Sequence, residues 1–209
     1  MMISMLNSMV AVGQLGLRPV RALAQPGRRP TSGVVGWADA NPGGTMQVTD
    51  LIDIEAIKRV KYRYLRCIDQ KLWDDLTEVL TEDCTAAYSG GAYSYEGRDA
   101  IIEFLRTSMG SQDFLSSHRC HHPEIDLTGP DTATGVWALE DVVIMKEWDL
   151  TVRGAAFYTD TYRRTPEGWR IDHTGYKRTY EEIQPRANVD GLRLTAEWWG
   201  TDGRSQLSA

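Results

Sequence analysis

Three of the four histidines of this chain lie in one short stretch, "SSHRCHHPEI", at residues 116–125. They are His118, His121 and His122, and Cys120 stands among them. An imidazole gains and loses a proton near neutral pH, and imidazole and thiolate groups also bind metals. The stretch therefore indicates one of three things: one histidine that acts as a general base beside others that do not, a metal site, or histidines without a chemical role.

A carboxylate is expected opposite one of these histidines. The segment "TGPD" at residues 128–131 predicts a hairpin turn, and a turn symmetric about the Gly129–Pro130 bond pairs residues whose numbers sum to 259. Since 118 + 141 = 259, His118 faces Asp141, with Cβ atoms about 4.5–5.5 Å apart. Asp141 is then expected to orient His118 and to stabilise its imidazolium form, unless a bulge near Pro123 shifts the register. A purely structural His–Asp pair is the alternative.

A metal site built from this stretch would use His118, Cys120 and His122 on one side of the strand. Zinc sites draw their ligands from recognisable spaced pairs, and the sequence has no second cluster of this kind. We therefore expect no metal and no other cofactor, because phosphate-binding glycine loops and paired cysteine motifs are also missing from the sequence.

A phenol and a second carboxylate come from the first helical pattern, at residues 49–70. Tyr64 lies on its apolar face, so its hydroxyl should enter the interior, where a phenol can donate a proton to a substrate oxygen. Asp69 falls at the helix end, where the helix dipole disfavours a carboxylate. It is expected to be a loop residue or to bond to Tyr64 or substrate. Trp137 shares the inward face of Asp141 and is expected to contact the substrate.

The elements that position these residues follow from the hydrophobic period. Helical spacing continues at residues 73–80 and 97–109, with a short hairpin between these two segments. From residue 132 the period changes to two, and "GAAFYTDTYRR" and "WRIDHTGYKRTYE" predict further strands joined at "TPEG". The pattern predicts an α+β fold in which three helices pack on one face of a curved, mostly antiparallel sheet.

The chain divides into three segments. Residues 1–45 are rich in Pro, Gly, Arg and Ala and show no period. This predicts an extension that is either disordered or wrongly assigned to the protein, with Met46 as the natural start. A signal peptide is the competing interpretation, although the positive charge follows the apolar run. Residues 46–183 form the folded domain. Residues 184–209 carry Trp198 and Trp199 on weak periodicity, and we expect a pocket flap or a subunit contact.

The bulk composition narrows the partners. A net charge of −6 without a basic stripe argues against nucleic acid, and no apolar run reaches the length of a membrane span. Three cysteines at irregular spacing, an odd number, do not make a disulfide framework. This favours a reducing compartment, and we expect the cytoplasm.

Five stretches together resemble the bile acid 7α-dehydratases, of the SnoaL-like branch of the scytalone dehydratase and ketosteroid isomerase superfamily. They are "DIEAIKRVKYRYLRCID", "HRCHHPEI", "TATGVWALED", "GAAFYTDTYRR" and "TGYKRTYEE". The resemblance runs in order over about residues 51–182. It implies a cone-shaped α+β barrel with a deep apolar pocket, assembled as a homotrimer, and it places Tyr64, Asp69, His118 and Asp141 at catalytic positions.

The resemblance also assigns Tyr88 and Arg178 to the pocket and matches His121 to a histidine without a clear role, which we take as substrate-binding. It implies a cofactor-independent dehydratase for a hydroxylated steroid or similar polycyclic enone. The segment "KEWDLTVRG" is shorter than the matching loop of those enzymes, and the residues after Glu182 diverge, so the substrate is expected to differ from theirs. A dehydrohalogenase or isomerase on the same scaffold, and a non-catalytic small-molecule-binding domain, remain as alternatives.

Overall fold

The computed structural model describes residues 46–207, so the predicted extension at residues 1–45 lies outside the described part. Three helices are present there: α3 (Val48–Asp69), α4 (Trp73–Thr77) and α5 (Arg98–Met109). None of the described helices is long and apolar enough to cross a membrane. The strands are β1 (Leu80–Tyr88), β2 (Tyr93–Glu96), β3 (Phe114–Gly129), β4 (Thr132–Met145), β5 (Leu150–Thr165) and β6 (Gly168–Pro185).

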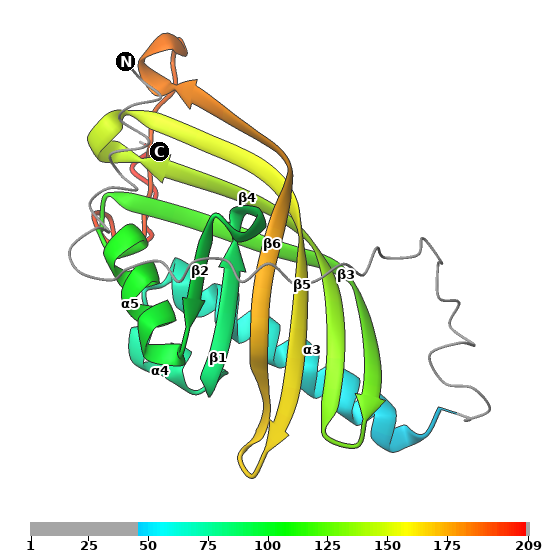
Figure 1. The fold of residues 1–209 in the computed structure, drawn as a ribbon. Coiled ribbons are helices and arrows are strands. Elements are labelled where there is room, and N and C mark those ends of the chain that lie inside the picture. Colours follow the sequence, from blue (N-terminus) through cyan, green and yellow to red (C-terminus); the bar gives the residue numbers. More distant parts are fainter. Residues whose placement is uncertain (1–45, 208–209) are drawn as a thin grey trace.

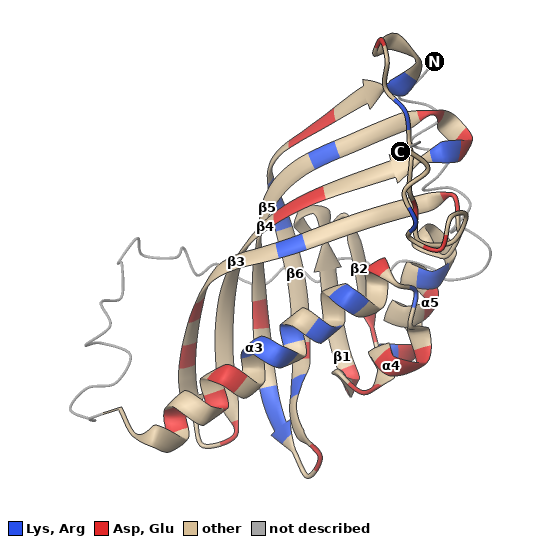
Figure 2. Ribbon diagram, turned by 180° about the vertical axis from the view of Figure 1, so that it is seen from behind, with Lys and Arg blue, Asp and Glu red and all other residues tan. Residues whose placement is uncertain are grey.

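The six strands form one curved sheet in the order β2-β1-β6-β5-β4-β3 (Figure 1). All neighbouring strands are antiparallel except β1 and β6, which run parallel. Seen from behind, α3 crosses in front of the sheet, and α4 and α5 lie beside it near β1 and β2 (Figure 2). This confirms the α+β architecture and the mostly antiparallel sheet predicted from the period of the sequence.

Helix α3 positions half of the candidate site. At its start the backbone N–H of Gln47 donates to the Asp50 carboxylate at 2.8 Å, which satisfies one of the end groups of the helix. Its buried residues, which include Ile57, Tyr64 and Ile68, recur at helical spacing and pack into the core under the sheet. The last residue of α3 is Asp69, so the helix carries this carboxylate to the beginning of β3.

The hairpin of β3 and β4 places His118 opposite Asp141, as predicted, but by a different route. Next to the turn Gly129 pairs with Thr132, whose numbers sum to 261, so the assumed symmetry of the turn is wrong. A first register shift between Leu127 and Gly129 brings the sum to 260, as for Ile125 and Gly135. The register then shifts by one between His121 and Glu124, where His122 adopts a left-handed φ of 47°. This bulge of one extra residue in β3 restores the sum of 259 beyond it.

The C-terminal segment after β6 folds back onto its own chain. The Lys146 ammonium group, just after β4, contacts the Glu197 carboxylate at 2.7 Å. Two residues further along the chain, the Trp199 ring lies over the Lys71 ammonium group, 4.5 Å from nitrogen to ring centroid. These contacts hold the tail against the region between α3 and β3.

Candidate active site

Asp69 and His118 form the centre of the candidate site. His118 donates twice to this carboxylate, from ring Nδ1 to Oδ1 at 2.6 Å and from its backbone N–H to Oδ2 at 2.9 Å. The Ser116 hydroxyl donates to Oδ1 at 2.8 Å. Alternate residues of β3 point to the same side of the sheet, so this strand supplies all three donors to the end of α3.

These donors explain why a carboxylate is stable at the C-terminus of a helix. The negative end of the helix dipole disfavours Asp69, and burial raises its pKa. The hydrogen bonds and charge from His118, together with the bond from Ser116, outweigh burial and bring the pKa of Asp69 below its ordinary value. The carboxylate is therefore ionised at neutral pH.

An ionised Asp69 also fixes the form of the imidazole. A carboxylate only accepts hydrogen bonds, so His118 must carry a proton on Nδ1, which leaves the lone pair on Nε2 in the neutral ring. The side chain of His118 keeps 11 % of its surface accessible and that of Asp69 keeps 21 %. The pair is thus shielded from bulk water without being closed off, and His118 is arranged to accept a proton at Nε2.

Asp141 does not orient His118, which corrects the prediction. Arg178 of β6 donates to both oxygens of the Asp141 carboxylate, from Nη1 to Oδ1 and from Nη2 to Oδ2 at 3.0 Å. Asp141 is 2 % exposed, so its charge needs this partner. The register was correct, but cross-strand opposition alone could not show which cation lies nearer to the carboxylate.

A glycine makes the Asp141–Arg178 pair possible. On β5, between the two partner strands, the residue opposite Asp141 is Gly154. A Cβ atom at this position would lie 2.7 Å from Nη1 of Arg178 and 2.9 Å from the backbone oxygen of Tyr180. The guanidinium group therefore crosses β5 in space that any side chain would fill.

The Tyr64 hydroxyl lies in the interior, as predicted, and shares a hydrogen bond of 2.8 Å with the Tyr88 hydroxyl. Both side chains are buried, and Asp69 does not contact Tyr64. The Tyr88 ring stacks on Phe104 of α5 and packs near Tyr176 of β6, at centroid distances of 5.8 and 5.9 Å. Aromatic rings of α5 and β6 thus pack around the Tyr88 side chain of this pair.

A buried ion pair deeper in the fold was missed from the sequence. Lys61 of α3 contacts Asp160 of β5 at 2.7 Å, and both side chains have no accessible surface. Thr174 and Tyr162 each donate to Asp160 at 2.8 Å. The signal was present, because Lys61 lies on the apolar face of α3 and Asp160 lies on the inward face of β5, where each charge needs a partner.

Two other predicted site residues are placed differently from expectation. His121 is exposed and follows Cys120 on β3, on the face opposite to His118, so the structure does not bring it to the site. Trp137 faces inward but has no accessible surface, and its indole N–H donates to the Tyr162 hydroxyl at 2.9 Å. Its position is that of a core residue beneath the site.

Two further features bear on ligands. Within residues 46–207 no three His, Cys, Asp or Glu side chains converge in a way that could hold a metal ion, and all three cysteines are free.

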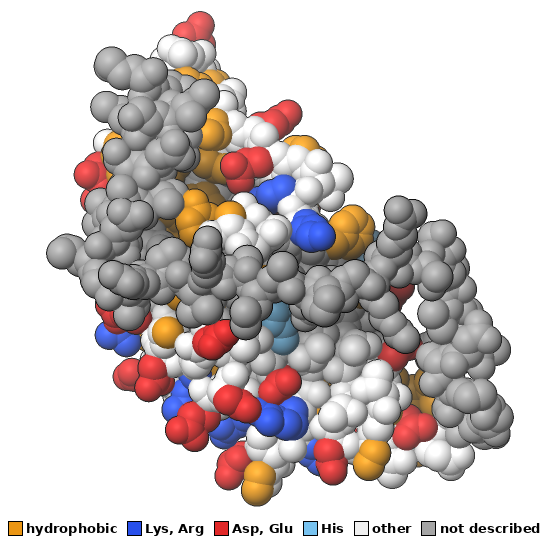
Figure 3. Space-filling view, in the orientation of Figure 1, with side chains coloured by type: hydrophobic (Ala, Val, Ile, Leu, Met, Phe, Trp, Pro, Cys, Tyr) orange, Lys and Arg blue, Asp and Glu red, His pale blue; other side chains and the backbone are white. Residues whose placement is uncertain are grey.

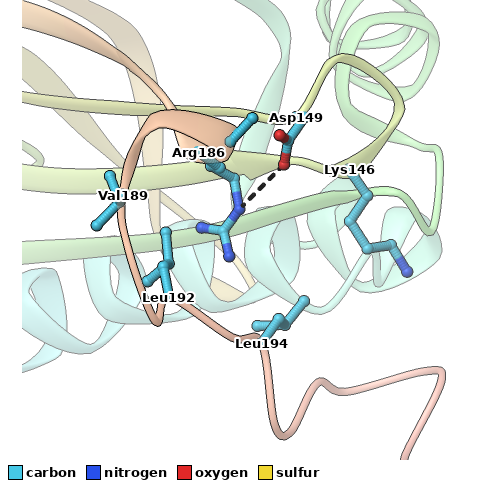
Figure 4. Close-up of a pocket in the computed structure, with 7 residues that line it drawn as sticks. Lys146, Asp149, Arg186, Val189, Leu192 and Leu194 are labelled. Carbon is cyan, nitrogen blue, oxygen red and sulfur yellow. Dashed lines mark ion pairs between the residues drawn. The ribbon is translucent and has the colours of Figure 1, made fainter.

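A pocket of about 430 Å³ lies beside the tail, where β4 and β6 end and β5 begins (Figure 4). Arg186, which pairs with Asp149, points into it, and none of the predicted site residues lines it.

The chain matches the SnoaL-like domain family over residues 49–175, and it therefore belongs to this family. An uncharacterised protein of Mycobacterium tuberculosis is 26 % identical over 129 residues, which are 60 % of this chain and 85 % of that protein.

Solved structures show the same cone-shaped fold. One is a "Putative Scytalone Dehydratase" from Novosphingobium aromaticivorans, with a TM-score of 0.61 and 21 % identity over 66 % of this chain and 91 % of that one. Another is the hexachlorocyclohexane dehydrochlorinase LinA-type3 from Novosphingobium barchaimii, with a TM-score of 0.59 and 17 % identity over 70 % of this chain and 97 % of that one.

Proposed function

We propose that the chain is a cofactor-independent lyase that eliminates water from a hydroxylated steroid or a similar polycyclic enone. The observation that carries the proposal is the Asp69–His118 pair, a partly shielded imidazole held with Nε2 free by an ionised carboxylate. The sequence resemblance to the bile acid 7α-dehydratases supports the substrate class. The names of the two structural relatives, a dehydratase and a dehydrochlorinase, support an elimination.

In this mechanism His118 Nε2 takes a proton from a carbon made acidic by conjugation to a carbonyl. The electrons of the C–H bond form the new double bond, and the C–O bond of the leaving hydroxyl breaks. Tyr64 gives its phenolic proton to the departing oxygen, which leaves as water. The proton on His118 then returns to solvent. Tyr88 gives a proton to Tyr64 and takes one from solvent in its place, so the enzyme is restored.

Tyr64 suits the role of acid. Burial, with smaller effects from Tyr88 and other neighbours, raises its pKa well above the ordinary value, so the phenol holds its proton until an oxygen with developing negative charge arrives. Arg178, held by Asp141 and 22 % exposed, is placed to bind a polar group of the substrate. Asp141 acts through Arg178 in this account.

The remaining expectations concern assembly. Large apolar side chains stand exposed on the outer face of the sheet, such as Phe157 at 52 % and Tyr180 at 51 %, and hydrophobic side chains are visible among charged ones on this side (Figure 3). They support a contact between subunits at the sheet. We propose the homotrimer that the sequence resemblance implies, and the cytoplasm as its location. We also propose that the tail at residues 184–209 acts as a flap over the site.

The test is to incubate the protein with hydroxylated steroid enones and to measure formation of the new double bond and release of water. His118→Ala should lower kcat by about 10²–10⁴-fold while the circular dichroism spectrum stays that of the wild type. Full activity in this variant on a confirmed substrate would exclude His118 as the base. Binding of enones without any conversion by the wild type would favour a non-catalytic binding domain.

A dehydrohalogenase is the second candidate, favoured by the structural likeness to a hexachlorocyclohexane dehydrochlorinase. The same base would act, and only the leaving group would differ. Matched substrates that carry a hydroxyl or a chlorine at the same carbon separate the two. A preference for chloride loss that persists in Tyr64→Phe would favour this candidate, because chloride leaves without a proton.

A further inference from the structure

Tyr158 of β5 differs from the other buried tyrosines of the core in having no hydrogen-bond partner for its hydroxyl among the described residues. The Tyr64 and Tyr88 hydroxyls bond to each other, and the Tyr162 hydroxyl donates to Asp160. Tyr158 is 3 % exposed, and no group among residues 46–207 hydrogen-bonds its hydroxyl. The hydroxyl oxygen of Tyr158 still keeps a small accessible surface, so a small polar group can reach it. A hydroxyl left unpaired in such surroundings is costly unless a ligand or water uses it.

The Tyr158 ring is firmly held. The Lys61 ammonium group lies 3.4 Å from its centroid on one side, and this nitrogen is itself fixed by Asp160 at 2.7 Å. The Tyr176 ring meets the Tyr158 ring edge-on, with centroids 5.4 Å apart. A cation over the face of a phenol draws electron density from the ring and strengthens its O–H as a donor. Burial raises the pKa of Tyr158 well above its ordinary value, so the proton stays in place.

Tyr158 and the base share one face of the sheet. His118 pairs with Asp141, Asp141 pairs with Gly154, and Tyr158 follows Gly154 by four residues on the same side of β5. That separation is about 13 Å along the strand. The donor and the base therefore lie on the same face of the sheet, at different positions along the strand direction.

Cys120 also lies on this face of the sheet. It is the next residue of β3 after His118 to face inward. Burial raises the pKa of its thiol to about 11, and the charges of Lys61 and Asp160 also act on it. The thiol is therefore close to the ion pair that holds Tyr158.

We propose that the Tyr158 hydroxyl holds the carbonyl oxygen of the substrate, with Lys61 and Asp160 as positioning residues for its ring. The inference rests on the proposed function and narrows its substrate class. A donor and a base this far apart fit a conjugated ketone in which the acidic C–H is separated from the carbonyl by a double bond. Negative charge that develops on the oxygen as His118 takes the proton is then stabilised by a donor already in place.

The test uses androst-4-ene-3,17-dione with ¹³C at carbon 3, bound to the full-length protein and observed by isotope-edited infrared spectroscopy. A carbonyl that accepts a hydrogen bond absorbs at lower frequency. The band should lie low in the wild type and rise in Tyr158→Phe, which removes only an oxygen that no described group uses and should therefore fold. Tyr176→Phe is the matched control, because this neighbouring ring faces the same space, and it should leave the band unchanged.

The kinetic readout is deuterium incorporation into the same ketone in heavy water. Tyr158→Phe should slow it by about 10²–10³-fold, with a smaller change in Kd. An unshifted band in the wild type, or a shifted band that persists in Tyr158→Phe, would overturn the assignment even where His118→Ala abolishes exchange. If the low carbonyl frequency depends on Tyr158 but His118→Ala exchanges deuterium at the wild-type rate, Tyr158 remains the donor and His118 is not the base.

Discussion

His118 donates to Asp69 from both its ring and its backbone, so one carboxylate at the end of α3 fixes the position and the proton of the imidazole together. Ser116 adds a third hydrogen bond to the same group. The acceptor oxygens of a carboxylate can serve all three donors, whereas an amide offers one acceptor oxygen. This difference leads to a prediction that needs no substrate.

In Asp69→Asn, an NH₂ group must face at least one of the donors from β3. The His118 ring should then lose its preference for a proton on Nδ1, as ¹⁵N chemical shifts of the imidazole would show. Asp141→Asn is the matched control, because Asp141 contacts Arg178 and not the ring. A tautomer that changes in Asp141→Asn but not in Asp69→Asn would restore the partner first expected from the sequence.

The Asp141–Arg178 pair should be important for stability. Arg178→Met leaves a carboxylate that is 2 % exposed without its cation, and we expect a loss of about 3–5 kcal/mol in the free energy of unfolding. The double variant with Asp141→Leu should recover most of it, because no charge is then buried. Arg63→Met, at a pair with the exposed Glu78, should cost less than about 1 kcal/mol. Urea unfolding would contradict this account if both arginine variants lost the same amount.

Gly154→Ala should loosen the same pair. The added methyl group would lie 2.7 Å from Nη1 of Arg178, and we expect a loss of about 1–3 kcal/mol in unfolding free energy. In an Arg178→Ala background part of the clash is removed, so the second substitution should cost less. Strict additivity in this double-mutant cycle would show that the guanidinium group does not occupy the space above Gly154.

Lys71 should make stability depend on pH in the alkaline range. Its ammonium group donates to the backbone oxygens of Met109 and Phe114 at 2.6 and 2.9 Å and is covered by Trp199. Burial lowers its pKa from 10.5 to about 8, although the charge of Asp69 acts in the opposite direction. Between these two values the unfolded chain binds the proton more tightly than the folded one. The folded state therefore gains stability as the pH rises through this window.

The measurement compares the wild type with Lys71→Met by urea unfolding at about pH 7.5 and about pH 9.5. The free energy of unfolding of the wild type, relative to that of the variant, should increase at the higher pH. Other groups that titrate in this range contribute equally to both proteins and cancel in the comparison. A difference that stays constant or decreases would mean that Lys71 is as well solvated in the folded protein as in the unfolded chain.

The sequence predicted features that depend on short-range pattern. The period of two located β4, β5 and β6. The assumed turn led to the pairing of His118 with Asp141, because an error at the turn was compensated by two register shifts in β3, one next to the turn and one at His122. It could not show that the end of α3 meets the beginning of β3, because that contact depends on how the helix crosses the sheet. Asp69 was therefore identified without its partner.

The buried charges mark the other limit of the sequence argument. Asp141 was recognised as a charge on an inward face, and the same argument applies to Lys61 on α3 and Asp160 on β5. Pairing these two requires knowing that α3 lies under β5, across about a hundred residues of chain. Inward-facing charges can thus be found from periodicity, but their partners come from the three-dimensional arrangement.

Removal of a proton from carbon by His118 is the central claim, and deuterium exchange tests it without knowledge of the leaving group. A panel of polycyclic enones would be incubated in heavy water with the wild type or with His118→Ala, and mass spectrometry would follow the label. The account predicts that the wild type exchanges at least one enone about 10²-fold faster than the variant or more. Equal rates for every enone of the panel would contradict it.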